Sequence, residues 1–118
     1  MDEATRVSQV DEVMPVVLDI LERWRGSSMV MSRADMCARL RCTDRVLRAA
    51  VAELRKAGYL IVVDDGGGYR FARSVDDVVA FTSSLKKRIQ SLREVVERME
   101  AASLRQFGSP GGQMELFG

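Results

Sequence analysis

Arginine side chains make a chemically distinctive pattern in the middle of this sequence. Residues 33–56 carry seven basic and three acidic groups, whereas residues 1–32 carry three basic and six acidic groups, although the whole chain has a formal net charge of +1. Arg45 and Arg48 lie three residues apart, so a helix would place both on one face. A guanidinium can bind two acceptor atoms at once, on the edge of guanine or on a phosphate. The pattern indicates a nucleic-acid-binding surface; the alternative is an ordinary solvated helix face.

Catalytic and metal-binding groups are scarce. The chain has no histidine, which is the commonest general base and metal ligand. Cys37 and Cys42 are the only cysteines, so no second pair completes a four-ligand zinc site. We interpret them as small, semi-buried thiols in a reducing cytosol. Gly66-Gly67-Gly68 leads into a predicted strand and lacks the helix N-terminus that a phosphate-binding loop needs. We therefore expect no enzymatic activity, no metal and no cofactor.

A helix beginning at Thr43 would position the central arginines. Thr43 is a suitable N-cap, and Gly58 lies where a helix ends in a left-handed residue. The residues predicted to be buried share helical spacing: Leu47, Ala50, Val51 and Leu54. Ala49 and Ala52 lie on the opposite face, and their short side chains would allow the helix to approach a DNA groove closely.

Two further helices are predicted before this one. Residues 1–11 are polar and weakly patterned, and a helix is expected to begin near Glu12–Pro15, since proline is tolerated in a first turn. Its apolar stripe would consist of Val16, Val17, Ile20, Leu21 and Trp24. An extended piece at 29–31 follows. Ser32-x-x-Asp35 then forms a capping pattern for a helix to about Leu40, with a turn at 41–43.

A hairpin is predicted after Gly58. Residues 59–63 are rich in strand-forming side chains, residues 64–68 supply a tight glycine-rich reversal, and residues 69–72 form the return strand. The order of elements is helix, short extended piece, helix, turn, helix, hairpin. This order predicts an α+β, mostly α fold: a winged helix-turn-helix with three helices and a two-stranded wing, followed by one long helix and a disordered tail.

Residues 32–73 resemble the winged helix-turn-helix of the biotin-repressor type. The resemblance rests on the capped helix, the short turn, the helix ending Leu54-Arg55-Lys56-Ala57-Gly58-Tyr59, and the wing closing on Gly68-Tyr69-Arg70-Phe71. It implies binding of double-stranded DNA with the third helix in the major groove. Asp64-Asp65 at the wing tip would repel phosphates. The expected DNA-contacting residues are Arg33, Arg39, Arg41, Thr43, Arg45, Arg48, Arg55, Arg70 and Arg73.

One long helix is predicted from about 75 to 105, because no glycine or proline interrupts that stretch. Its apolar residues from position 85 recur in steps of 4, 3, 4 and 3, as in a coiled-coil seam. They are Leu85, Ile89, Leu92, Val96 and Met99. The seam would join two chains into a homodimer. The alternative is that its inner half packs on the first helix while the outer half frays.

The chain ends in Gln113-Met114-Glu115-Leu116-Phe117 after a glycine-rich linker. This peptide resembles the bacterial sliding-clamp-binding pentapeptide. The resemblance implies that Gln113 is a polar anchor and that Leu116 and Phe117 fill an apolar pocket on the clamp. Met114 stands where leucine is usual, and Glu115 stands where serine or aspartate is usual. The alternative is a fortuitous tail that packs back on the domain.

The sequence thus predicts four regions: a flexible N-terminus (1–11), a winged helix-turn-helix (12–73), a long helix (74–105) and a tail (106–118). The expected function is that of a DNA-binding replication or repair accessory that docks on the sliding clamp. The layout is also loosely similar to small proteins of phage and prophage replication regions. The alternatives are a transcriptional regulator dimerised by the long helix, and a protein-interaction module. The N-terminus lacks a signal pattern, so a cytoplasmic, nucleoid-associated location is expected, with no membrane or small-molecule partner.

Overall fold

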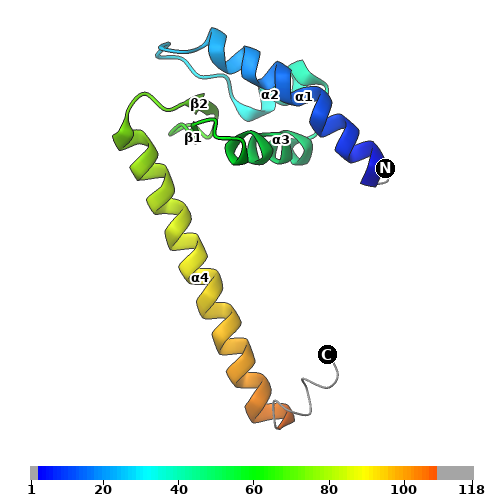
Figure 1. Ribbon diagram of the computed structural model, residues 1–118, viewed down its shortest axis with the longest axis vertical. Helices are drawn as coiled ribbons and strands as arrows, with labels where there is room; N and C mark the ends of the chain where they lie inside the picture. Colours follow the sequence, from blue (N-terminus) through cyan, green and yellow to red (C-terminus); the bar gives the residue numbers. More distant parts are fainter. Residues whose placement is uncertain (1–2, 109–118) are drawn as a thin grey trace. The chain divides into compact units, whose positions relative to one another are not determined.

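The computed structural model describes the backbone of residues 3–108 and the side chains of residues 9–108. Within this range the elements are α1 (Glu3–Arg23), α2 (Arg33–Leu40), α3 (Asp44–Lys56), β1 (Ile61–Val63), β2 (Tyr69–Phe71) and α4 (Val75–Phe107) (Figure 1). The predicted α+β, mostly α class is confirmed. The clamp-like pentapeptide at 113–117 lies outside the described residues.

Helix α1 begins earlier than the sequence pattern indicated. It starts at Glu3 and contains Pro15 inside the helix, rather than starting near 12–15 as predicted. The residues just before the proline explain the difference, because Val13 is buried against Val46 and Ala50 of α3. This packing holds the first part of the helix in place despite the backbone hydrogen bond that proline cannot make.

The two helices after α1 are capped as their sequences predicted. The hydroxyl of Ser32 accepts a hydrogen bond from the backbone N–H of Asp35 at 3.0 Å, and that of Thr43 accepts one from Val46 at 3.2 Å. Arg41 adopts a left-handed conformation (φ 54°) after the last residue of α2. The chain therefore reverses between α2 and α3 within three residues.

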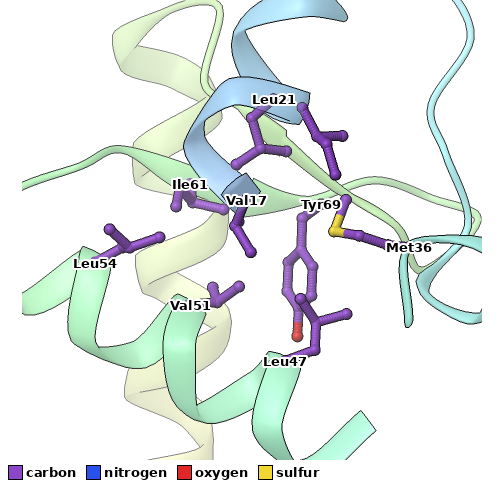
Figure 2. Close-up of a cluster of buried hydrophobic side chains, with 9 residues drawn as sticks. Val17, Leu21, Met36, Leu47, Val51, Leu54, Ile61 and Tyr69 are labelled. Carbon is purple, nitrogen blue, oxygen red and sulfur yellow. The ribbon is translucent and has the colours of Figure 1, made fainter. Parts of the chain in front are cut away.

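One apolar core joins α1, α2, α3 and the hairpin. Figure 2 shows Val17 and Leu21 of α1 pointing toward α3, with the ring of Tyr69 among them. All four residues predicted on the buried face of α3 are buried, and so is Val46. Val16 was wrongly assigned to the apolar stripe of α1, because it is 45% exposed.

The hairpin closes as the glycine-rich sequence predicted. Strands β1 and β2 are antiparallel, with Ile61 opposite Phe71 and Val63 opposite Tyr69. Gly67 has a φ of 91°, a conformation that other residues rarely adopt. Its backbone N–H donates to the carbonyl of Asp64 at 2.8 Å. The turn thereby places the return strand against the core, where Tyr69 is buried.

The predicted extended segment at 29–31 is not assigned as a strand, but it lies against the hairpin. A Cβ atom on Gly68 would collide with the carbonyl oxygen of Met31 and would come within 2.9 Å of Cγ1 of Val30. Glycine at 68 is therefore required by close approach of two backbones. The approach ties the connection between α1 and α2 to the end of the hairpin turn.

Helix α4 begins at a cap formed by Ser74, whose hydroxyl accepts from the N–H of Asp77 at 3.2 Å. It ends at Phe107, two residues later than predicted, followed by Gly108 with a φ of 98°. The described part of the chain divides into two compact units, with the division between Phe81 and Thr82 inside α4. No helix among the described residues is long and apolar enough to cross a membrane.

Candidate nucleic-acid interface

The exposed face of α3 carries two of the predicted DNA-contacting arginines. Arg45 and Arg48 are both exposed, on the side of the helix opposite the buried Leu47 and Leu54. Ala49 and Ala52 are also exposed. Because both alanines have short side chains, nothing between the arginines would hold a flat or grooved partner away from the helix backbone.

Asp44 links α2 and α3 through two ion pairs. Its carboxylate lies 3.0 Å from Nε of Arg48 and 3.6 Å from Nε of Arg33. The three side chains are 42–63% exposed, so solvent screens the attraction and its contribution to stability is small. The ion pairs are important for the positions of the arginines rather than for stability, because one carboxylate contacts both Arg33 of α2 and Arg48 of α3.

The other arginines of α2 and the turn are solvent-accessible. Arg33 lies at the first position of α2, Arg39 in its last turn, and Arg41 in the left-handed position that follows. All three side chains are exposed. Together with Arg45 and Arg48 they form a set of five exposed arginines, which we call the arginine surface. It belongs to two consecutive helices and the turn between them.

Thr43 was predicted both as a helix cap and as a DNA contact. The structure uses its hydroxyl oxygen as the acceptor for the N–H of Val46, and the residue remains exposed. Its hydroxyl hydrogen is not needed for the cap, so the side chain retains a donor. The role of Thr43 in DNA binding stays a prediction.

The structure holds Arg55 within the domain. Its Nε donates to the carbonyl of Ile61 at 2.8 Å, and its guanidinium lies 4.4 Å from the ring centroid of Phe81 and 5.7 Å from that of Tyr69. Burial lowers the pKa of this guanidinium below its usual value. These contacts join α3, the hairpin and the first turns of α4, so we leave Arg55 out of the arginine surface.

Arg70 is likewise engaged within the chain. Its Nη1 lies 2.8 Å from Asp77 of α4, and its Nε lies 3.3 Å from Asp64 in the hairpin turn. The side chain is 19% exposed. Hydrogen bonding from Arg70 is the main cause that lowers the pKa of Asp77 to about 2, and the backbone N–H of Arg73 adds a second bond at 2.7 Å. Arg70 thus neutralises the charge of Asp64, so the repulsion of phosphates expected from Asp64 and Asp65 together is reduced.

Arg73 makes a hydrogen bond to a residue far from it in the sequence. Its Nη2 donates to the carbonyl of Ser27 at 2.8 Å, joining the start of α4 to the segment after α1. The residue as a whole is exposed. Like Arg70, it belongs to the part of the chain from β2 to the start of α4 rather than to α2 or α3.

The remaining predicted groups are placed as follows. The five seam residues from Leu85 to Met99 lie on α4, and none of them is buried.

Cys37 and Cys42 are free and half-buried, and burial is the main cause that raises the pKa of the Cys42 thiol. Within residues 3–108, no three histidine, cysteine or carboxylate side chains gather where a metal ion could be held.

The partners of three arginines were not predicted from the sequence. These partners are Asp44 for Arg48, Asp77 for Arg70 and Phe81 for Arg55. Asp44 had a local signal, since it stands four residues before Arg48, the spacing of an intrahelical ion pair. Asp77 and Phe81 had none, because their partners Arg70 and Arg55 lie on other elements. Only the packing of α4 against the hairpin and α3 within the first unit brings them together.

No protein-family model, no curated protein and no solved structure matches this chain. The functional interpretation therefore depends on the geometry of the molecule and on the resemblances noted in its sequence.

Proposed function

We propose that this chain is a winged-helix protein that binds double-stranded DNA through the arginine surface, with α3 entering the major groove. The observation that carries the proposal is the set of five exposed arginines on two helices joined by a three-residue turn. In a helix-turn-helix the second helix reaches base edges and the preceding helix and turn meet the backbone. Arg45 and Arg48 belong to the first two turns of α3, which is the part that enters the groove.

The order of elements supports the same proposal. The chain has three helices followed by an antiparallel hairpin, which is the order of elements that a winged helix has. The hairpin contributes little to DNA binding in this proposal, because Arg70 is committed to Asp64 and Asp77. Affinity then depends mainly on α2, the turn and α3.

The DNA-binding proposal is tested by fluorescence anisotropy with a labelled duplex. Replacing Arg45 and Arg48 together with alanine is expected to weaken binding by about 30- to 1,000-fold, since each contact to a base or phosphate contributes roughly 1–2 kcal/mol. Arg98→Ala on α4 removes one exposed arginine outside the arginine surface and is the matched control. Equal affinity of the double variant and the wild type would favour the protein-interaction alternative.

We further propose that the C-terminal peptide docks the protein on the sliding clamp. The support is the resemblance of Gln113-Met114-Glu115-Leu116-Phe117 to the clamp-binding pentapeptide and the glycine-rich stretch that precedes it. Such a peptide alone would bind in the micromolar range, about −8 kcal/mol. A clamp encircles DNA, so a DNA-bound copy of this chain would meet the clamp at a raised effective concentration.

Surface plasmon resonance on immobilised clamp tests the docking separately. Deletion of residues 113–118, or the substitution of Leu116 and Phe117 by alanine, is expected to abolish binding. Leu104→Ala changes an exposed apolar residue of α4 outside the seam and serves as the control. Unchanged binding after the deletion would contradict docking through the C-terminal peptide. It would favour the alternative that the protein is a transcriptional regulator.

A further inference from the structure

Helix α4 exposes an apolar seam that the described residues do not cover. None of its 33 residues is buried. The exposed fractions are 55% for Ile89, 60% for Leu92, 53% for Val96 and 68% for Met99. An isolated helix gains little stability from propensity alone, and most helices in proteins are stabilised by packing of their apolar face. A partner that covers this seam would therefore stabilise the helix.

The spacing of the seam identifies the kind of surface that fits it. From Leu85 the apolar residues recur in steps of 4, 3, 4 and 3, an average of 3.5 residues. A helix that packs on a globular core shows a wider stripe with a 3.6-residue period, whereas a strict 3.5-residue seam winds around another helix. The partner is accordingly a helix of similar length.

The residue types at the two seam positions select a second copy of α4. Ile89 and Val96 occupy the a positions and Leu85 and Leu92 the d positions of the heptad, a combination that favours two parallel strands. Parallel alignment in register places each seam residue beside its own copy. Leu85 and Met99 lie 14 residues apart, so the seam is about 21 Å long, and two copies paired along it would bury less than the roughly 1,000 Å² of a stable specific interface, which predicts a weak dimer.

The charges beside the seam limit the strength of this pairing. Arg88 occupies a g position and Arg93 the following e position. In a parallel pair these positions face each other across the interface, so Arg88 of one copy meets Arg93 of the second copy, twice per dimer. Like charges at these positions oppose association, and salt screens them.

We propose that α4 is a dimerisation helix: two copies of the chain pair in parallel through Leu85, Ile89, Leu92, Val96 and Met99, in a coiled coil weakened by Arg88–Arg93 repulsion. This inference does not depend on DNA or clamp binding. The dimer is expected to become tighter as the salt concentration rises, opposite to the salt dependence of DNA binding.

Sedimentation equilibrium of the full chain tests the dimer. The wild type is expected to be dimeric at tens of micromolar, and Leu92→Asp is expected to raise the dissociation constant by at least about 100-fold, because one buried leucine per chain is lost. Leu104→Asp places the same charge on α4 outside the seam, at a b position, and should leave the constant unchanged. A monomeric wild type at these concentrations would overturn the proposal, as would equal effects of the two substitutions.

A substitution that strengthens the dimer tests the parallel orientation, and it does not require a variant that folds less well. Arg88→Glu replaces two repulsive contacts by two attractive contacts with Arg93 of the second copy, and should tighten the dimer by about 10-fold at low salt. In an antiparallel seam Arg88 would not face Arg93. Arg98→Glu makes the same change at a c position and should have no effect. A dimer constant unmoved by Arg88→Glu would contradict the parallel pairing.

Discussion

The carboxylate of Asp44 lies 3.0 Å from Nε of Arg48, within the first two turns of α3. The same carboxylate also contacts Arg33 of α2, so an acid lies beside two members of the arginine surface. Asp44 therefore has two opposite effects on a DNA partner. It orients two arginines, and it adds a negative charge that repels phosphate.

Replacing Asp44 with asparagine tests which effect is larger. Because the three side chains are substantially exposed, the orienting ion pairs contribute little, and the removal of a charge should dominate. We expect Asp44→Asn to tighten duplex binding by about two- to fivefold at low salt, with a smaller gain at high salt. Glu53→Gln, which removes an acid near the other end of α3, should change affinity less. Weaker binding by Asp44→Asn would show that orientation of the arginines matters more than charge.

The ion pair between Arg70 and Asp77 predicts a specific acid dependence of stability. The pKa of Asp77 is lowered to about 2 from an ordinary value of 3.8, so its stabilising contribution is fully present above pH 3.8 and is lost as the pH falls toward 2. Asp77→Asn should therefore unfold at a lower temperature than the wild type at pH 7, and the difference should shrink toward zero as the pH falls through 2. Asp76→Asn, in the same helical turn, provides the comparison in thermal unfolding followed by circular dichroism. A difference that persists unchanged to pH 2 would contradict the assignment.

The close approach at Gly68 predicts an unequal effect of two glycine substitutions in one turn. A methyl group at 68 meets the backbone of Met31, whereas a methyl group at 66 finds only the carboxylate of Asp64, at 3.9 Å. Gly68→Ala should lower the free energy of unfolding by about 1–3 kcal/mol through overpacking, and Gly66→Ala should change it by less than about 1 kcal/mol. Urea unfolding measures both. Equal values would show that the segment at 30–31 moves aside freely.

Arg55 is expected to affect stability and not DNA affinity. Its hydrogen bond to Ile61 and its contact with Phe81 should make Arg55→Ala less stable by about 1–2 kcal/mol. Folded Arg55→Ala protein should bind duplex DNA within about twofold of the wild type, in contrast to the Arg45 and Arg48 variants. A large loss of affinity in this variant, measured where it is fully folded, would return Arg55 to the DNA-contacting set.

The local features of this fold could be predicted from the sequence, because their causes are local. Thr43 and Ser32 cap helices through hydrogen bonds that span three residues, and Gly58 and Gly67 have the positive φ values expected of them. The buried face of α3 followed from helical spacing alone. These signals need no knowledge of which elements pack together.

The start of α1 and the fate of two arginines could not be predicted in the same way. Val13 holds the helix before Pro15 only because α3 supplies Val46 and Ala50. Arg55 and Arg70 look like surface arginines until α4 brings Phe81 and Asp77 beside them. A sequence pattern shows that a side chain is charged, but the tertiary structure decides whether that charge faces a partner or another part of the chain.

The salt dependence of duplex binding tests the central claim most directly. If the arginine surface meets phosphates, the logarithm of the association constant of the full chain should fall linearly with the logarithm of the salt concentration, with a slope of about −0.9 for each phosphate contacted. Substituting alanine for Arg39 and Arg41, which the proposal places at the DNA backbone, should reduce the magnitude of the slope by up to about 2, whereas Arg98→Ala should leave it unchanged. A wild-type slope near zero, or one that the double substitution does not alter, would contradict the proposed interface.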